Sequence, residues 1–194
     1  MVSLCYNISI MKNYIVFDLE WNQSANGKER SIPHFPFEII EIGAVKLNET
    51  FQMVDEFHRL IRPQVYTQMH HAISEVTHMD MKELRNSGEL FPDAAADFLS
   101  WCGGDAVFCT WGNMDLLELQ RNMDYYHMDN PFPKPLFYYD VQKLYGLFCR
   151  ENARISLDSA VEEQSLLENR PFHRALDDAY YTGKLLTMLG HEPG

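Results

Sequence analysis

Two carboxylates on alternate residues are the first feature of this chain that could do chemistry. Asp18 and Glu20 end an apolar run that starts at Tyr14 and is predicted to be a strand buried on both faces. Because side chains alternate along a strand, both acids point to the same side, where they repel one another unless a cation lies between them. Oxygen-only ligands favour a hard divalent ion such as Mg²⁺ or Mn²⁺. Taken alone, however, the pair fits two solvated carboxylates at a strand end better than a metal site.

A third acid follows a second apolar run. Residues 106–110 are predicted to form another buried strand, residues 111–113 interrupt it, and Asp115 lies in the first turn of a helix that continues to Met123. An aspartate at that place ordinarily caps the helix or complements its dipole. For Asp115 considered alone, capping is the favoured interpretation.

A titratable base stands near the other end of the chain. His173 precedes a helix whose apolar residues recur with helical spacing up to Leu189, and Asp177 and Asp178 lie on its first turns. Both aspartates could simply complement the helix dipole. A neutral imidazole beside metal-bound carboxylates would instead be suited to accept a proton from water at neutral pH.

The order of these residues is that of a known family. An Asp-x-Glu pair, a mid-chain Asp and a His-x4-Asp motif, spread from about Tyr14 to Leu189, resemble the DEDDh branch of the DnaQ-like 3′→5′ exonucleases. The matching residues are Asp18, Glu20, Asp115, His173 and Asp178. The resemblance implies that the four acids bind two divalent cations, Mg²⁺ or Mn²⁺, and that His173 is the catalytic base. It also implies two-metal hydrolysis of the 3′-terminal phosphodiester with release of nucleoside 5′-monophosphates.

Two further segments refine the resemblance. Trp21 after the first acids, and Trp111-Gly112 where many members have a His-Asn pair, are similar to the Eri1-like and KinA-pathway sporulation-inhibitor branch. Val76-Thr77-His78 stands where the family often has Leu-Thr-Gly. The candidate substrate contacts are Trp21, Thr77, His78, Trp111 and Asn113. Core packing explains the two tryptophans about as well as base stacking does.

Helix geometry leaves one assignment to be decided. Asp177 follows His173 by four positions, so the two would share a face of a continuous helix from which Asp178 is rotated away. The family pattern selects Asp178 instead. The two agree if His173 lies on the loop just before the helix. We therefore expect Asp178 to be the metal ligand and Asp177 to be a helix-start acid.

Composition limits the class of protein. A chain of 194 residues with 46% apolar side chains is long and apolar enough for one ordered domain. The four cysteines lack the spacing of a metal site, and we expect free thiols in a reducing compartment. No apolar run has membrane-spanning length, and the N-terminus lacks the layout of a signal peptide. We therefore expect a cytoplasmic protein without a membrane partner.

The net charge limits the kind of nucleic acid. It is −12, and the 16 basic residues are scattered along the chain. A protein that wraps a long duplex normally carries a basic stripe. We therefore expect the partner to be a single-stranded or short RNA or DNA 3′ end, contacted at few phosphates. The sequence does not separate RNA from DNA, and it identifies no protein partner.

The apolar patterns also predict the elements that position these residues. Strands are expected at 14–21, 37–47, 51–61, 105–110 and 137–139, and helices at 68–76, 91–102, 114–126, 140–150, 156–164 and 173–189. Three early strands followed by strand and helix alternation predict an α/β fold, a ribonuclease-H-like mixed five-stranded sheet flanked by helices. We expect a single exonuclease domain over residues 14–190 and an N-terminal appendage over residues 1–13.

Two other functions are compatible with the sequence. One is a non-catalytic nucleic-acid-binding or regulatory domain, which the sporulation-inhibitor resemblance suggests. The other is a DNA proofreading or repair exonuclease. Because all five motif residues are intact, we expect a metal-dependent 3′→5′ exonuclease, a hydrolase that acts on phosphodiester bonds.

Overall fold

The computed structural model describes residues 12–26, 31–132, 137–149 and 154–191. Its strands are β1 (Asn13–Asn22), β2 (Glu38–Leu47), β3 (Met53–Leu60), β4 (Ala106–Thr110) and β5 (Tyr138–Asp140). Its helices are α1 (His71–Thr77), α2 (Met81–Ser87), α3 (Phe91–Cys102), α4 (Met114–Tyr125), α5 (Val141–Phe148), α6 (Leu157–Glu163) and α7 (Ala175–His191). Nearly all of the predicted appendage, residues 1–11, lies outside the described residues, so its boundary stays a prediction.

The strands form one mixed sheet in the order β3-β2-β1-β4-β5. β1, β2 and β3 pair antiparallel, whereas β4 pairs parallel with β1 and β5 parallel with β4. Parallel neighbours require crossover connections, which α1 to α3 supply before β4 and α4 supplies before β5. The prediction of a mixed five-stranded sheet flanked by helices is therefore confirmed.

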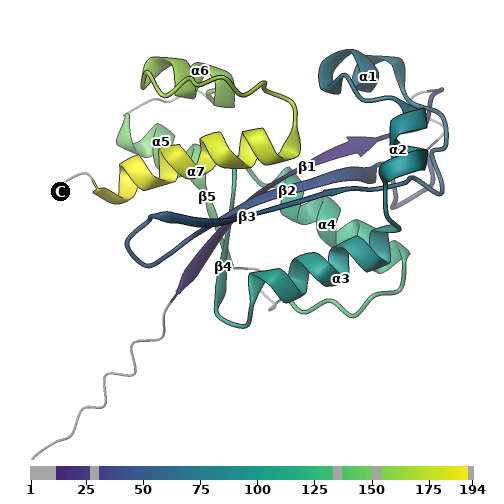
Figure 1. The fold of residues 1–194 in the computed structure, drawn as a ribbon, viewed down its shortest axis with the longest axis horizontal. Coiled ribbons are helices and arrows are strands. Elements are labelled where there is room, and N and C mark those ends of the chain that lie inside the picture. Colours follow the sequence, from purple (N-terminus) through teal and green to yellow (C-terminus); the bar gives the residue numbers. More distant parts are fainter. Residues whose placement is uncertain (1–11, 27–30, 133–136, 150–153, 192–194) are drawn as a thin grey trace, which may run out of the picture.

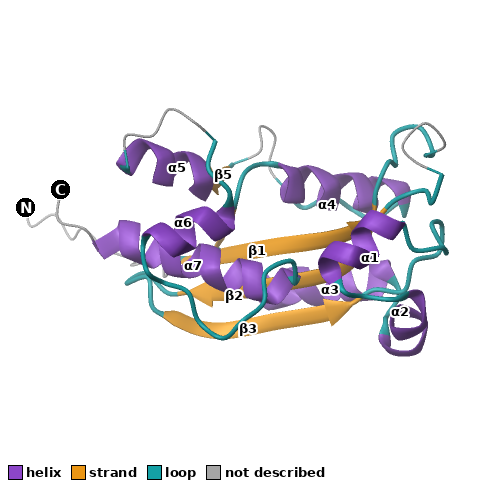
Figure 2. Ribbon diagram, turned by 90° about the horizontal axis from the view of Figure 1, so that it is seen from above, coloured by secondary structure: helices purple, strands orange, loops and turns teal. Residues whose placement is uncertain are grey.

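Helices cover both faces of this sheet (Figures 1 and 2). α3 and α4 pack on one face, where Phe17 and Phe98 belong to the same buried cluster. α5, α6 and α7 lie together on the other face, where Val16 packs in a cluster with Leu186 of α7. Successive residues of β1 thus face opposite layers, as strand alternation requires.

α7 packs closely onto the middle of the sheet because β2 has no side chain at Gly43. A Cβ at that position would lie 2.0 Å from the backbone nitrogen of Leu176, in the first turn of α7. Further along α7, Gly183 gives similar room to Val45, whose Cγ2 would lie 2.8 Å from an added Cβ. The two glycines set how closely α7 approaches the sheet, and thereby where its first turns meet β1.

The observed elements match the predicted ones apart from small shifts at their ends, one helix that was not predicted and a later start of the last helix. The apolar pattern of the sequence did not predict α2, a helix of 7 residues in which the Asp80 side chain accepts a hydrogen bond from the Glu83 NH. A helix this short shows little apolar periodicity. The last helix begins at Ala175 rather than at His173, because His173 has a positive φ of 65°. No helix of the described ranges is long and apolar enough to cross a membrane.

Candidate active site

β1 carries the first two acids on the face that α7 covers. Phe17 and Leu19 point into the core on the α3 side, so Asp18 and Glu20 point the other way, as predicted. Both acids are only partly exposed to solvent. Burial of two neighbouring carboxylates makes the position suitable for a cation.

Asp178 of α7 completes a group of three carboxylates. One oxygen from each of Asp18, Glu20 and Asp178 lies within 4.8 Å of the others. Asp178 is 9% exposed, and its Oδ2 accepts a hydrogen bond from the backbone NH of His173 at 3.2 Å. Its Oδ1 is buried and has no hydrogen-bond partner within the part of the chain that the structure describes. A buried oxygen without a partner, next to two other carboxylates, fits the coordination of a divalent cation.

Asp115 lies beside this group at the start of α4. It is 5% exposed, and its Oδ1 accepts a hydrogen bond from the backbone NH of Leu19, between the two acids of β1. The transition from β4 to α4 therefore brings this acid to β1. Its oxygens lie outside the group within 4.8 Å, but its charge acts on Asp18. The structure thus brings together all four predicted acids.

The four carboxylates are unfavourable as anions in the absence of a cation. Burial, followed by repulsion from Asp115 and Asp178, holds the pKa of Asp18 well above its usual range. Burial likewise raises the pKa of Glu20 to about 8, and it raises the pKa of Asp115 and of Asp178 to about 7. A divalent cation among these oxygens would offset the repulsion and favour the ionised forms. An all-oxygen donor set fits Mg²⁺ or Mn²⁺.

His173 lies in the loop just before α7, as the family register requires. Its imidazole is exposed, and its backbone is tied to Asp178 by the hydrogen bond given above. Because His173 stands outside the helix, it shares no helical face with Asp177, whose carboxylate pairs with Arg170 at 3.1 Å. The structure therefore places Asp178, rather than Asp177, beside the acids of β1.

A fifth acid, Glu41, lies beside the site and was not predicted from the sequence. It lies opposite Glu20 in the register of β1 and β2 and is 1% exposed. Burial alone would raise its pKa, but hydrogen bonds from His58 and Arg174 outweigh burial, and the pKa is lowered. The available signal was a charged residue inside the apolar run 39–45, because a buried carboxylate requires partners.

The two tryptophans predicted to contact substrate pack against other rings. The centroid of Trp21 lies 5.6 Å from that of Phe37, and the centroid of Trp111 lies 5.9 Å from that of Tyr145. The Nε1 of Trp111 is buried without a hydrogen-bond partner among the described residues. These contacts are those of core packing, and base stacking by either ring stays a prediction.

The other predicted substrate contacts, Thr77, His78 and Asn113, differ in whether their side chains are exposed or already hydrogen-bonded. The buried Thr77 hydroxyl is engaged within its own turn, since it donates to the Ile73 carbonyl and accepts from the Met79 NH. His78 is exposed and ends α1 with a φ of 57°, a conformation that glycine adopts readily, so the backbone here would also suit the glycine of the Leu-Thr-Gly pattern. Asn113 is exposed at the start of α4, and its side chain makes no capping hydrogen bond.

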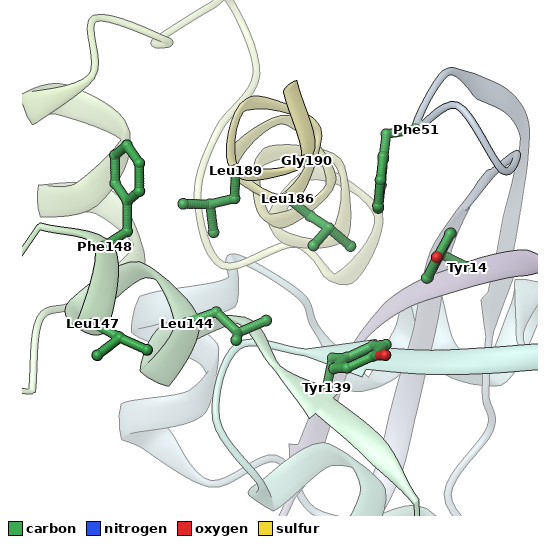
Figure 3. A pocket seen from close by; sticks show the side chains of 9 residues that line it. All are labelled: Tyr14, Phe51, Tyr139, Leu144, Leu147, Phe148, Leu186, Leu189 and Gly190. Atoms are coloured by element: carbon green, nitrogen blue, oxygen red, sulfur yellow. The ribbon is translucent and has the colours of Figure 1, made fainter. Parts of the chain in front are cut away.

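An apolar pocket of about 390 Å³ lies near the start of β1, away from the acids (Figure 3). Its walls come from β1, β5, α5, α7 and the turn between β2 and β3, and they include Tyr14, Leu147 and Leu186. Tyr14 precedes Asp18 by four residues of extended strand, a distance of roughly 13 Å. The described residues that line the pocket include no Asp, Glu, His, Lys or Arg, and the pocket is therefore separate from the acid site.

Known proteins match nearly the whole chain. The RNase T family model, described as an exonuclease, matches residues 15–186. The probable 3′-5′ exonuclease KapD of Bacillus subtilis strain 168 is 28% identical over 185 residues, which cover 90% of this chain and 83% of KapD. The PolC-type DNA polymerase III of Thermotoga petrophila is 33% identical over 150 residues, which cover 76% of this chain but 10% of the polymerase.

Solved nuclease structures share the fold. The nuclease domain of 3′hExo, a DEDDh family member bound to rAMP, has a TM-score of 0.75 at 23% identity, over 93% of this chain and 92% of that one. Exonuclease I of E. coli in complex with a dT13 oligonucleotide has a TM-score of 0.74 at 13% identity, over 93% of this chain and 41% of that one. These likenesses confirm the predicted ribonuclease-H-like fold.

Proposed function

The chain belongs to the RNase T family of exonucleases, in its DEDDh type, and from this membership we propose that it removes nucleoside 5′-monophosphates from the 3′ end of single-stranded or short nucleic acids. The observation that carries the proposal is the group of Asp18, Glu20 and Asp178, whose oxygens converge within 4.8 Å. Buried carboxylates at that separation are unfavourable unless they bind cations. Cations held beside a titratable base meet the requirements of metal-assisted hydrolysis.

The acids divide into donors for two divalent ions. We assign Asp18, Glu20 and Asp178 to the first ion, because their oxygens already converge. Asp18 and, partly through water, Asp115 are assigned to the second. The ions, when bound, activate the attacking water and stabilise the leaving 3′ oxygen. The unpartnered Oδ1 of Asp178 is the protein atom that a cation would satisfy.

His173 is assigned to accept the proton of the attacking water. Its imidazole is exposed, so the proton can pass to solvent after each turnover. Its backbone NH is bonded to Asp178, so the base and a cation ligand are held in one turn of the chain. Activity should therefore require the neutral imidazole.

The proposed substrate is a short single strand. Relatives of the same fold hold rAMP in one structure and a dT13 oligonucleotide in another, so both RNA and DNA are candidates. A net charge of −12 favours few phosphate contacts over the many that a long duplex requires. The assembled acids favour a catalytic domain over a non-catalytic binding or regulatory domain.

The test uses matched single strands of RNA and DNA, each labelled at the 5′ end, with the full chain and Mn²⁺. We expect stepwise shortening from the 3′ end, release of 5′-monophosphates and loss of activity in EDTA. A strand blocked at its 3′ end is the matched control and should stay intact. Internal cleavage, or turnover that persists in Asp18→Asn, would overturn the proposal. The ratio of the two rates decides between RNA and DNA.

A further inference from the structure

Glu41 joins three elements of the fold through one carboxylate. From β2, its Oε1 pairs with the Nε2 of His58 on β3 at 2.7 Å. The Nη2 of Arg174 donates to Oε1 at 2.7 Å, and its Nε donates to Oε2 at 3.2 Å. The backbone NH of Ala175 also donates to Oε2, at 3.0 Å. Both oxygens of Glu41 are therefore bonded to donors from β3 and the start of α7.

These contacts converge on the turn that carries His173. Arg174 and Ala175 are the next two residues, and Ala175 begins α7. The positive φ of His173, 65°, is uncommon for a residue other than glycine. The turn is attached on both sides, by the His173 NH to Asp178 and by Arg174 and Ala175 to Glu41. An uncommon backbone conformation persists only when its surroundings hold it in place.

The charge of Glu41 is stabilised by its own donors but repels the neighbouring Glu20, and this repulsion requires a reason. Glu41 lies opposite Glu20 and, after burial and Asp178, is one of the causes that raise the pKa of Glu20. An apolar residue within the same apolar run would avoid that repulsion. A bidentate pair between arginine and a carboxylate, however, fixes direction as well as distance, which apolar packing does not. The ion pair between Glu41 and Arg174 therefore fixes the orientation of the first turn of α7, although the charge of Glu41 repels Glu20.

We propose that Glu41 and Arg174 are positioning residues that hold His173 in the orientation needed to accept the proton of the attacking water. The inference rests on the proposed hydrolysis, and it assigns neither residue a contact with substrate. The competing role is a direct contact between Arg174, whose side chain is 31% exposed, and a substrate phosphate. A positioning residue lowers kcat, whereas a phosphate contact made equally in the ground state raises KM.

Arg174→Met tests the inference, because methionine retains much of the apolar volume of the arginine stem. We expect kcat to fall by about 10- to 100-fold, as for a misplaced catalytic group, with KM and Mn²⁺ affinity unchanged within about twofold. Arg170→Met is the matched control. Arg170 has a similar exposure of 29% and also bridges α7 to β3, through Asp177 and Glu56, without reaching Glu41. Its kcat should remain that of the wild type.

A second arm asks whether Arg174 acts through the imidazole. In a His173→Ala background, Arg174→Met should cause no further loss of kcat, since a residue that works through His173 has no effect once the imidazole is absent. An equal loss in both backgrounds would overturn the inference, and so would a rise in KM with unchanged kcat. If the buried Glu41 prevents Arg174→Met from folding, the double variant Glu41→Gln/Arg174→Met removes that charge and is measured in the same way.

Amide hydrogen exchange at His173 gives a reading that needs no turnover. The exchange should be about tenfold faster in Arg174→Met than in the wild type, and unchanged in Arg170→Met. If the wild type is active but Arg174→Met changes neither the exchange at His173 nor kcat, the positioning role is overturned. A wild type that releases no nucleotide would instead overturn the proposed hydrolysis, and with it the catalytic purpose of the turn, whatever the exchange shows.

Discussion

Asp18 on β1 lies directly opposite Gly43 on β2, and the absence of a side chain at Gly43 allows Asp178 to reach Asp18. The first turn of α7 rests on Gly43, with the Leu176 nitrogen 2.0 Å from where a Cβ would be. Asp178 follows two residues later and joins the acids of β1. The cation site therefore depends on a residue that has no functional group of its own.

Gly43→Ala should displace the start of α7 and weaken the cation site. The added Cβ meets backbone, which cannot rotate away as a side chain can, so we expect at least the roughly 1–3 kcal/mol typical of an overpacked core. Urea unfolding measures the stability, and Mn²⁺ titration by calorimetry measures the affinity. Gly104→Ala is the control, because no atom of the described residues, apart from its chain neighbours, lies within 4 Å of its added Cβ. Unchanged Mn²⁺ affinity in Gly43→Ala would contradict the proposed dependence.

Asp18→Asn should abolish activity while the fold is retained. It removes the acid that we assign to both ions, and it also removes one charge from a repelling, buried group. The melting temperature of the metal-free variant should therefore be equal to or above that of the wild type. Nucleotide release measures the loss of activity, and thermal unfolding in EDTA measures the melting temperature of the metal-free variant. A variant that is inactive because it is unfolded would leave the assignment of Asp18 without support.

Asp178→Asn and Asp177→Asn should differ sharply. Asp178 joins the group within 4.8 Å, so its loss should weaken Mn²⁺ binding and remove most of the turnover. Asp177 pairs with Arg170 and should mainly lose a partly exposed ion pair, worth up to about 1 kcal/mol. Parallel measurement of kcat and Mn²⁺ affinity decides the matter. If Asp177→Asn lowered kcat and Mn²⁺ affinity more than Asp178→Asn does, the assignment of Asp178 as the cation ligand would be wrong.

Local patterns in the sequence predicted where Asp18, Glu20 and Asp115 would lie. Alternation along β1 set the common face of Asp18 and Glu20, and the break after β4 set Asp115 at a helix start. The choice between Asp177 and Asp178 needed more than helical phase. It required the family pattern, and the structure gives the physical reason. The positive φ of His173 keeps this residue outside α7, so its imidazole does not follow the helical spacing that would pair it with Asp177.

Glu41 could not be placed from local pattern because its partners are remote in the sequence. Arg174 lies 133 positions away, and neither residue has a spacing that points to the other. Thr77 shows the converse case. The family pattern makes its hydroxyl a candidate for substrate contact, whereas the structure engages it with Ile73 and Met79 inside one turn. Local periodicity thus predicts faces and ends of elements, but not which polar groups meet across the fold.

Metal-free protein should lose stability as the pH rises. In the folded state, burial raises the pKa of Glu20 to about 8 and that of Asp115 and Asp178 to about 7. Carboxyl groups of an unfolded chain titrate near about pH 4. Between these values the folded state binds more protons than the unfolded state, so the free energy of unfolding falls with pH. The decline should begin at about pH 4 and continue through about pH 8, the pKa of Glu20.

Urea unfolding in EDTA across this range measures the effect. Asp115→Asn removes one of the raised carboxyl groups and should make the decline shallower. Saturating Mn²⁺ should offset most of it, because the cation stabilises the ionised acids and must displace their protons. A free energy of unfolding that rises from about pH 5 to about pH 8 in EDTA would mean that burial does not raise the pKa of these acids.

Affinity for a single strand should depend only weakly on salt. Several basic side chains are already paired with acids, among them Arg121 with Glu118, Lys143 with Asp140 and Arg174 with Glu41. The 16 basic residues are scattered along a chain of net charge −12, so we expect only a few of them to meet one strand. We expect contacts to about two to four phosphates, each contributing about −0.7 to the slope of log K against log salt. Binding in Ca²⁺, under conditions without turnover, gives that slope.

The same shortage of phosphate contacts should make the enzyme distributive, because a strand held at few points dissociates often between cuts. All labelled molecules should therefore shorten together, and a trap of unlabelled strand added after the start should stop the reaction. Raising the salt should reduce the rate only modestly at subsaturating substrate. A slope that corresponds to about six to ten phosphates, together with digestion that continues in the presence of the trap, would refute the charge argument.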